Sequence, residues 1–391
     1  MARLSKARWL NVLRGVALVG CCIAYGGCKQ QNDNQSQNSP SVETIRLGAI
    51  LPLTGSEAKY GKTSRAAIDL AISEINGNAD KTGVRFDCVF EDDAMNAGKG
   101  VSAAKKLISS DNVRVIIGPM GSTVTLAVAP IAERAKVVLL SPGSSAPGIA
   151  DTGEFIFRNC LSDKYEGSEM GAFVYEKMAL HKVAIYHINN DFGVGLAKVF
   201  RESFEAKGGK IVLEEAFDQG SGDHRTALTK IKAASPDGVY LVGYNEMVSV
   251  FRQAKELGLK TQWLGTTFLS DQSLVDKMGD DADGAALAAW VYNPESANPK
   301  IRNFVTNIRQ KTGGQDPDVF SANSYDAVYL IAEAVRLRGK TSDQIREGLL
   351  AIKDYDGVTG KTTFESNGDV RKQIEFKSIV RGKLQAYVVP K

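Results

Sequence analysis

From Thr44 onward, short apolar runs rich in β-branched residues alternate with segments whose apolar residues recur at helical spacing. Ile45–Leu53 shows the first pattern, and Ser64–Asn76 shows the second, with Leu70, Ala71 and Ile75 on one helix face. The alternation continues through Val84–Phe90, Gly98–Ser109, Val113–Ile117, Thr123–Arg134 and Val137–Leu140. Strands that alternate with helices of this length predict an α/β fold, in which helices cover both faces of a parallel sheet.

The alternation restarts after a predicted loop that extends to residue 182. The second series comprises Val183–His187, Val194–Lys207, Ile211–Phe217, Arg225–Ala234, Gly238–Val242 and Met247–Leu257. The C-terminal third is predicted to be helical first and to end in two strands, at Pro299–Lys311, Ala322–Arg338, Asp343–Ile352, Ile374–Val380 and Leu384–Val388. Two such series predict two similar lobes. Ligands of open parallel sheets bind beyond the carboxyl ends of the strands, so the loops there are the places to seek a site.

The first 27 residues have the composition of a secretion signal. A basic segment that ends at Arg14 precedes the apolar stretch Gly15–Gly27, which is too short to span a membrane as a helix. Gln30–Ser41 is polar and cannot bury a core. We therefore expect residues 1–27 to be a signal peptide and residues 28–43 to be a flexible tether.

The segment that ends at Cys28, YGGC, resembles a bacterial lipobox, in which small residues precede an acylated cysteine. The segment that ends at Cys21, LVGC, has the leucine that the box prefers, but it leaves little apolar core after Arg14. Cys28 is therefore the favoured lipid-bearing residue, with Cys21, or a signal without a lipid, as the alternative. We expect the two cysteines of the body, Cys88 and Cys160, to be free buried thiols, with a single bridge between them as the alternative.

The net charge of the whole chain, +3, comes from its N-terminus. Four of its 48 basic residues lie in the first 27, which hold no acid, so the remainder has 44 bases, 45 acids and a charge of about −1. This balance gives no support to binding of nucleic acid or of an anionic membrane surface.

The sequence lacks the usual enzyme motifs. The three GKT runs lack the glycine that a P-loop has five residues earlier, and neither G-x-S-x-G nor G-x-G-x-x-G occurs. The three histidines are scattered along the chain. We therefore expect no enzyme activity, no catalytic residues, no cofactor and no metal.

Two loops that follow apolar strands are rich in small and hydroxyl residues. Gly118–Thr123 opens a helix after the run VRVIIG, and Ser141–Pro147 follows the run VVLL. A hydroxyl and the free backbone N–H groups of a helix N-terminus can bind an anion. Each loop taken alone is explained as well by an ordinary helix cap or turn. Because the two loops follow neighbouring strands, together they can hold one carboxylate.

These loops belong to a wider resemblance. LPLTG at residues 51–55, followed by A-x-YG at residues 58–61, resembles the opening of the periplasmic leucine/isoleucine/valine-binding proteins, which are receptors of amino-acid ABC transporters. The likeness continues through VIIGPMGS, LLSPGSS, VAIYHINNDFGVGLA, DGVYLVGYNEM, RQAKELGLKTQWLG and GDDADG, and it covers Thr44 to about Tyr387. It implies a type I periplasmic-binding-protein fold, in which two Rossmann-like lobes with parallel sheets are joined by a three-strand hinge and enclose the ligand.

The resemblance also implies roles for particular residues. Ser122 matches the serine whose hydroxyl and backbone contact the ligand carboxylate. Ser144 and Ser145 match the pair that offers a backbone carbonyl and a hydroxyl to the polar end of the ligand. Tyr60 matches an aromatic residue that lies against the ligand side chain, and Tyr244 matches a tyrosine of the second lobe that closes over the ligand.

Two positions depart from the pattern of this family. Phe192 replaces a tyrosine of the second lobe, so one hydroxyl is missing. Thr267 stands where the family usually has the acid that pairs with the ligand's ammonium, and a desolvated ammonium without a counter-charge is costly. Either another acid substitutes, with Glu246 and Asp271 nearby in sequence, or the ligand has no ammonium.

We expect lobe one to comprise residues 44–160 and 291–368, and lobe two residues 161–290 and 369–391. The predicted protein is an extracytoplasmic solute-binding lipoprotein, periplasmic or at the cell surface, that captures a branched-chain or similar small amino acid by lobe closure. Its expected partners are the ligand, an ABC transporter permease and the membrane through the lipid, and a monomer is expected. The alternatives are a binding protein for an aromatic or keto acid, and a ligand-sensing receptor.

Overall fold

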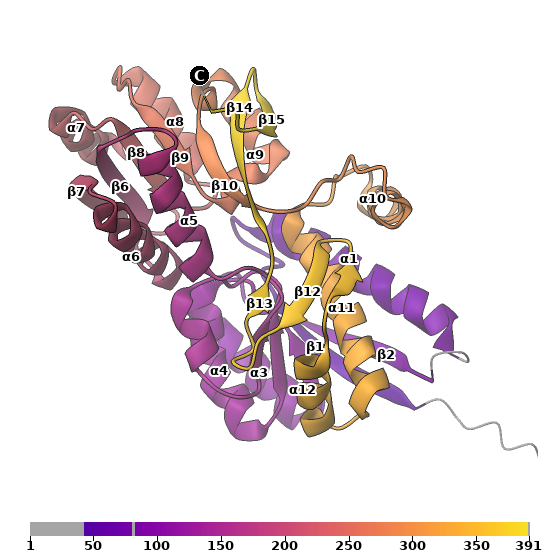
Figure 1. Ribbon diagram of the computed structural model, residues 1–391. Coiled ribbons are helices and arrows are strands. Elements are labelled where there is room, and N and C mark those ends of the chain that lie inside the picture. Colours follow the sequence, from indigo (N-terminus) through magenta and orange to yellow (C-terminus); the bar gives the residue numbers. More distant parts are fainter. Residues whose placement is uncertain (1–42, 80–82, 390–391) are drawn as a thin grey trace, which may run out of the picture. The chain divides into compact units, whose positions relative to one another are not determined.

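The computed structural model describes residues 43–79 and 83–389, so the predicted signal peptide and Cys28 lie outside the described residues. The chain from Val42 onward forms one compact unit. Its described strands form a five-stranded, a seven-stranded and a three-stranded sheet. The five-stranded sheet is the centre of the first lobe and the seven-stranded sheet is the centre of the second (Figure 1). The predicted α/β fold with two lobes is thereby confirmed.

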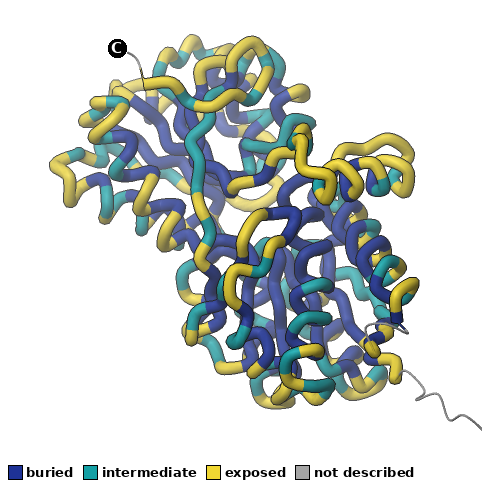
Figure 2. The backbone as a smooth tube through the Cα atoms, turned by 45° about the vertical axis from the view of Figure 1, so that its right-hand side comes forward, coloured by how far each residue is buried: buried dark blue, intermediate teal, exposed yellow. Residues whose placement is uncertain are grey.

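The sheet of the first lobe is entirely parallel, with the strand order β2-β1-β3-β4-β5. Its strands are β1 (Thr44–Leu51), β2 (Arg85–Asp92), β3 (Val115–Ile117), β4 (Val138–Ser141) and β5 (Ile156–Arg158). Successive residues of a strand point to opposite faces of a sheet. Ile116 and Leu139 accordingly pack on one face, and Ile117 and Leu140 on the other. Both faces are apolar because helices cover both of them (Figure 2).

The helices of the first lobe come from two distant parts of the chain. One face of the sheet is covered by α3 (Ala97–Ser109) and α4 (Ser122–Ala135). The other face is covered by α1 (Ala58–Gly77), α10 (Pro299–Thr312), α11 (Val319–Arg338) and α12 (Ser342–Ala351). The short helix η1 (Pro147–Asp151) lies between β4 and β5, and the small antiparallel sheet β11 (Tyr355–Gly357), β12 (Gly360–Phe364) and β13 (Val370–Arg371) follows α12.

The second lobe repeats this architecture around a mixed sheet with the order β15-β14-β10-β9-β8-β6-β7. Its strands are β6 (Lys182–Ile188), β7 (Lys210–Phe217), β8 (Gly238–Val242), β9 (Gln262–Gly265), β10 (Ala286–Trp290), β14 (Ile374–Val380) and β15 (Lys383–Ala386). Strands β6 to β10 pair in parallel, whereas β14 and β15 pair antiparallel. Its helices are α5 (Asp163–Glu176), α6 (Asp191–Ala206), α7 (Arg225–Ala234), α8 (Met247–Glu256), η2 (Thr267–Ser270), α9 (Gln272–Met278) and η3 (Gly279–Ala282).

Within the part of the chain that the structure describes, the backbone passes between the two lobes three times. The connections follow β5, β10 and β13, as Figure 1 shows. Strand β13 still pairs with β12, and β14 is the first later strand of the second lobe. The predicted boundaries at residues 160, 290 and 368 remain a proposal for where the lobes separate.

Helix α5 lies inside the segment that the sequence pattern predicted as a loop. Its packing depends on two glycines, because a Cβ at Gly167 would lie 3.0 Å from Leu196 and Val199, and one at Gly171 would lie 2.9 Å from the carbonyl oxygen of Phe200. The glycines therefore let α5 approach α6 closely. The few large apolar residues of α5 explain why helical spacing was not evident in the sequence.

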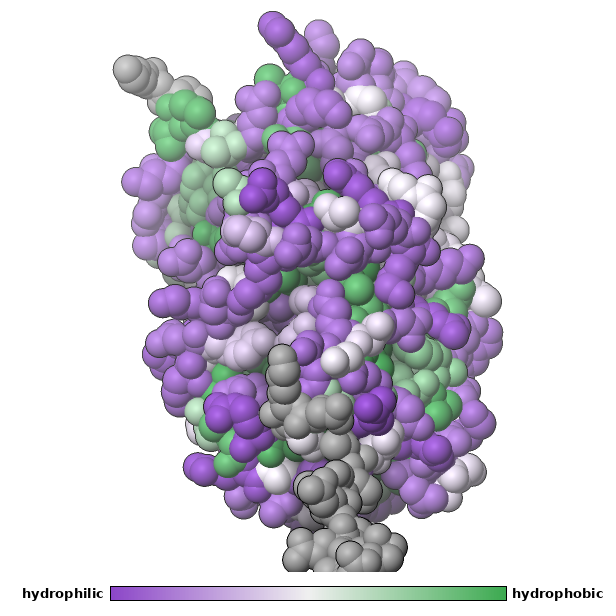
Figure 3. All heavy atoms as spheres, turned by 90° about the vertical axis from the view of Figure 1, so that its right-hand side faces the viewer, coloured by the Kyte–Doolittle hydropathy of each residue, from purple (hydrophilic) through white to green (hydrophobic). Residues whose placement is uncertain are grey.

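The face drawn in Figure 3 is mostly hydrophilic, and its hydrophobic residues form separate patches. Among the described residues, no helix is long and apolar enough to cross a membrane. Cys88 and Cys160 are free thiols, as expected, although Cys88 is only half-buried.

A buried ion pair fixes the connection that follows β5. Arg158, which is 1% exposed, pairs with Asp369 through Nε at 2.5 Å. Its guanidinium also donates to the carbonyl oxygens of Ser145 at 2.7 Å and Ala146 at 2.8 Å, and to the hydroxyl of Ser162 at 2.8 Å. Because the head group is satisfied on all sides, it can hold the Ser141–Pro147 loop against the crossover between the lobes.

Asp369→Asn tests the structural role of this pair. Removing one charge leaves Arg158 buried without a counter-ion, so we expect the free energy of unfolding to fall by about 3–5 kcal/mol. Urea denaturation of residues 44–391 measures the change. Arg371→Ala, which breaks the exposed pair with Glu365, is the matched control and should cost about 1 kcal/mol or less. Equal effects of the two substitutions would contradict the assignment.

Candidate functional site

A pocket lies between the two lobes, at the carboxyl ends of their strands. It encloses about 530 Å³, counted together with its opening to solvent, which is within the range of small-molecule sites. The lining residues come from loops and helix starts of both lobes: Pro52, Glu57, Tyr60, Met95, Met120, Ser122, Gly143, Ser145, Glu166, Phe192, Tyr244, Thr266, Thr267, Phe268, Trp290 and Phe320. Among the described residues that line it, none is a lysine, arginine or histidine.

The start of α1 shapes one wall of the pocket. The prediction began this helix at Ser64, but it begins at Ala58, so Tyr60 lies in its first turn. Gly61 makes this early start sterically accessible, because a Cβ there would lie 2.1 Å from the carbonyl oxygen of Pro52. The tight contact between the loop after β1 and α1 brings Glu57 and Tyr60 to the pocket.

The predicted anion loops lie in the first lobe, beside each other. Ser122 is the first residue of α4, where backbone N–H groups have no partner within the helix. Its hydroxyl oxygen accepts a hydrogen bond from the N–H of Ala146 at 3.2 Å, so the hydroxyl hydrogen is left to donate elsewhere. Ser145 also lines the pocket, and its carbonyl oxygen is held by Arg158. The helix start and the second loop thus meet at one end of the pocket.

Ser144, the third predicted serine, is fully buried but is not among the lining residues. Its hydroxyl lies 2.7 Å from that of Thr125 and donates to the carbonyl oxygen of Pro119 at 3.0 Å. Its carbonyl oxygen accepts from Cys160. These bonds join the two loops to each other, and a contact between Ser144 and the ligand stays a prediction.

Six aromatic rings form a continuous wall that spans both lobes. Phe192 stacks on Tyr244 with centroids 5.4 Å apart, and Tyr244 lies 5.0 Å from Phe268. Phe268 in turn lies 5.0 Å from Tyr60 and 5.3 Å from Phe320, and Phe320 lies 5.6 Å from Trp290. This wall suits an apolar group of a ligand. Phe192 lacks the hydroxyl of the tyrosine that the family has at this position, but its ring forms part of the aromatic wall.

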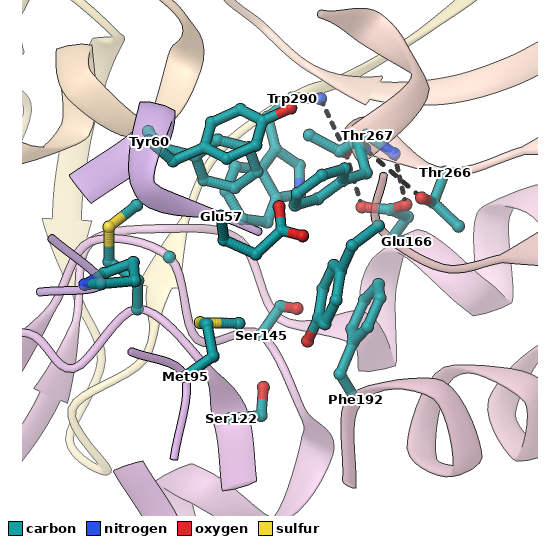
Figure 4. A pocket seen from close by; sticks show the side chains of 16 residues that line it. Glu57, Tyr60, Met95, Ser122, Ser145, Glu166, Phe192, Thr266, Thr267 and Trp290 are labelled. Carbon is teal, nitrogen blue, oxygen red and sulfur yellow. Dashed lines mark hydrogen bonds between the residues drawn. The ribbon is translucent and has the colours of Figure 1, made fainter. Parts of the chain in front are cut away.

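Thr267 lies next to an acid that the sequence patterns did not single out. Glu166 of α5 accepts from the backbone N–H of Thr267 at 2.9 Å and from its hydroxyl at 2.7 Å. The carboxylate is 1% exposed, and its burial raises its pKa above the usual value. Figure 4 shows Glu166 beside Thr267 at the edge of the pocket. An acid is therefore present here, but both of its oxygens are occupied by Thr267.

The two acids that the sequence suggested as substitutes do not line the pocket. Glu246 accepts from the backbone N–H groups of Gly220 at 2.7 Å and Tyr244 at 3.2 Å. Asp271 pairs with Lys59 at 2.6 Å and accepts from the Tyr60 hydroxyl at 2.9 Å. Although burial opposes it, this pairing lowers the pKa of Asp271. Both acids already have partners within the protein.

Glu57 is the second acid of the pocket, and its environment is different. It precedes α1, is 2% exposed and projects into the pocket (Figure 4). One oxygen, Oε2, accepts from the side chain of Asn245 at 2.8 Å, while the buried Oε1 has no hydrogen-bond partner. Burial, and next the charge of Glu246, raises the pKa of Glu57 to about 7. Glu57 lies in a loop that follows a strand, which is where the fold pattern predicts a ligand site. The sequence patterns did not single out this residue.

Contacts across the cleft hold the lobes together. Lys59 and Tyr60 of the first lobe bond to Asp271 of the second. The Thr123 hydroxyl donates to the Asp191 carboxylate at 2.6 Å. Asn245 donates to the carbonyl oxygen of Ser56 at 3.1 Å as well as to Glu57. These contacts bridge the two lobes beside the pocket, which residues of both lobes line.

Comparison with known proteins identifies the family of this chain. The sequence model of the family described as periplasmic binding protein matches residues 44–379, and the chain belongs to that family of solute-binding proteins. The leucine-, isoleucine-, valine-, threonine- and alanine-binding protein of Pseudomonas aeruginosa is 28% identical over 336 residues, which are 85% of this chain and 89% of that protein.

Solved structures show the same fold. The branched-chain amino acid transporter substrate-binding protein LivJ of Streptococcus pneumoniae, in complex with isoleucine, is 29% identical with a TM-score of 0.80, covering 88% of this chain and 98% of that one. An ABC transporter solute-binding protein of Rhodopseudomonas palustris, in complex with 3,4-dihydroxybenzoic acid, is 26% identical with a TM-score of 0.79, covering 87% and 95%. The predicted family resemblance and type I fold are confirmed.

The buried position of Glu57 predicts a pH dependence of stability. A carboxyl group whose pKa is raised from 4.5 to about 7 on folding stabilises the folded state fully below pH 4.5 and loses that contribution as the pH rises through 7. The loss at this one group is about 3 kcal/mol at most. We expect ligand-free Glu57→Gln to gain stability relative to the unmodified chain between pH 5 and 8, as measured by thermal melting. Parallel melting curves over that range would contradict the raised pKa.

Proposed function

We propose that this chain is the extracytoplasmic receptor of an ABC importer and captures a small amino acid with an apolar side chain. The observation that carries the proposal is the division of the pocket into three chemical regions. The α4 start with Ser122 and Ser145 suits a carboxylate, the buried acids suit an ammonium, and the aromatic wall suits an apolar side chain. The lack of a basic lining residue among those described argues against an additional acidic group on the ligand.

The positions of the predicted residues support a role for each of them in this proposal. Ser122 and Ser145 bind the carboxylate, with Ser144 supporting the loop. Tyr60 packs against the ligand from the first lobe. We propose that Phe192 and Tyr244 of the second lobe close over the side chain of the ligand. Thr267 covers that side chain from another side.

Capture depends on closure of the lobes, not on a chemical step. The connections after β5, β10 and β13 absorb the rotation, and the ligand favours the closed form because it contacts both lobes only there. The transporter permease then recognises the closed form. A dissociation constant in the micromolar range, or about −8 kcal/mol, is sufficient for such a receptor.

The proposal also includes the place of the protein in the cell. Residues 1–27 direct export, and Cys28 carries the lipid that anchors a monomeric receptor to the membrane, in the periplasm or at the cell surface. The polar segment after Cys28 gives the receptor reach from the membrane to the permease.

Lipid labelling of the two cysteine variants tests this anchor. We expect labelling to be lost in Cys28→Ser and retained in Cys21→Ser.

A second candidate ligand is a carboxylic acid without an ammonium, such as a benzoate. The aromatic wall favours it, and the Rhodopseudomonas palustris protein of similar fold was solved with 3,4-dihydroxybenzoic acid.

A thermal-shift screen of residues 44–391, refolded to remove bound ligand, separates the two classes of ligand. Each amino acid is compared with its des-amino analogue. At a free concentration 100-fold above Kd, a true ligand stabilises by about 2.7 kcal/mol. A shift with the des-amino acids alone would replace the amino-acid proposal by this one.

Ser122→Ala tests the carboxylate end. Loss of a hydrogen bond to a charged group costs about 1.5–3 kcal/mol, so we expect affinity to fall about 10-fold to 100-fold for every ligand with that carboxylate. Titration calorimetry measures the change. Ser102→Ala, on an exposed turn of α3, is the control and should leave the affinity unchanged. An unaltered affinity in Ser122→Ala would remove this serine from the site.

A further inference from the structure

We propose that Glu57 of the first lobe supplies the counter-charge for the ammonium group of the ligand. This inference rests on the proposed function, because it requires an amino acid as the ligand, and it identifies the residue that distinguishes an amino acid from its des-amino analogue. The first observation is the state of the carboxylate. Glu57 is 2% exposed, and its Oε1 is buried at the pocket without a partner. A carboxylate oxygen that is removed from water requires a donor or a positive charge.

No described residue at the pocket supplies that charge. The described residues that line the pocket include no base, and Lys59, the nearby cation, is paired with Asp271. The partner of Oε2 is the neutral amide of Asn245. Apart from protonation of Glu57 itself, a donor that enters with the ligand can satisfy Oε1. An ammonium group brings both the charge and the donors.

Glu166, the other acid of the pocket, is a poorer candidate. Its two oxygens accept from the N–H and the hydroxyl of Thr267, so each oxygen already has a hydrogen-bond donor within the protein. It lies at the edge beside Thr267, whereas Glu57 projects into the space that the lobes enclose (Figure 4). Glu166 positions Thr267 on the second lobe, and Glu57 receives the ligand.

The location of Glu57 gives the first lobe both polar anchors of the ligand. Glu57, Ser122 and Ser145 all come from loops or helix starts around the five-stranded sheet. The open protein can therefore bind the two charged ends of an amino acid before the lobes close. Asn245 of the second lobe then donates to Glu57 and to the neighbouring carbonyl oxygen of Ser56. Closure thus depends on the same carboxylate that binds the ligand.

The charges of the groups around Glu57 support the same assignment as its position. The titratable groups that face Glu57 are Tyr60 in the first turn of α1, Tyr244 and Glu246 of the loop before α8, and Glu166 across the pocket. None of these is a cation. Burial and the charge of Glu246 raise the pKa of Glu57 to about 7, and an ammonium would favour the ionised form. The affinity for an amino acid should therefore rise between pH 6 and 8.

Selectivity measured on Glu57→Gln tests the inference. The probes are the standard amino acids and their des-amino analogues, beginning with leucine and 4-methylpentanoate. We expect the unmodified chain to bind the amino acid, and Glu57→Gln to bind it at least about 100-fold more weakly. The affinity for the des-amino acid should stay equal or increase in Glu57→Gln, because the negative charge is gone. The rise of amino-acid affinity with pH should disappear in the same variant.

Two further variants make the result specific. Glu154→Gln removes an exposed acid of the same lobe, which pairs with Arg346, and should bind as the unmodified chain does. Glu57→Asp keeps the charge but shortens the side chain, and it should retain part of the preference for the amino acid. If Glu57→Gln does not fold, the preference of Glu57→Asp for the amino acid tests the role of Glu57 in its place.

The outcomes separate the inference from the proposed function. If the unmodified chain binds an amino acid and Glu57→Gln binds it equally well, the role of Glu57 is wrong while the amino-acid receptor stands. An equal loss for the amino acid and for its des-amino analogue would reduce Glu57 to a closure contact with Asn245. Binding of des-amino acids alone to the unmodified chain would overturn both the inference and the proposed function.

Discussion

The site depends on one constraint, namely that a carboxylate removed from water must be paired or must take up a proton. Several acids around the cleft are buried, and the protein pairs some of them in different ways. Asp271 has Lys59, Glu166 has the N–H and hydroxyl of Thr267, and Asp369 has Arg158. Glu57 keeps one oxygen without a partner. We propose that the ligand supplies the donor for this oxygen.

The remainder of the first lobe can be understood as the support for this arrangement. The parallel sheet is apolar on both faces, so the polar groups available for a ligand lie in the loops at the carboxyl ends of its strands. Arg158 joins one of these loops to the crossover between the lobes through bonds to Ser145 and Ala146. The ion pair that stabilises the connection therefore also fixes the serine at the polar end of the pocket.

The sequence predicted the fold well because alternating apolar periodicity is a property of contiguous residues. It failed at α5, whose glycines and polar residues give little helical pattern, and at the start of α1, where Gly61 interrupts it. The residues around the cleft were accessible mainly through family resemblance. Tyr60, Ser122, Ser145, Phe192, Tyr244 and Thr267 all line the pocket, as the structure shows.

Residues whose position depends on distant contacts were missed. Glu166 reaches Thr267 across 101 positions of sequence, and Asn245 reaches Glu57 across 188. Nothing local in the sequence reports such a pairing. Glu57 was the most accessible of the missed residues, because it lies in the first loop after a strand, next to the quoted motif. Its free oxygen became evident only from the three-dimensional arrangement.

The most direct test of the account is a crystal structure of residues 44–391 with the amino acid that gives the largest thermal shift. We expect the ligand between the lobes, with its carboxylate at Ser122 and its ammonium nitrogen within hydrogen-bond distance, about 2.7–3.2 Å, of Oε1 of Glu57. An ammonium directed to Glu166, or a ligand bound outside this pocket, would contradict it.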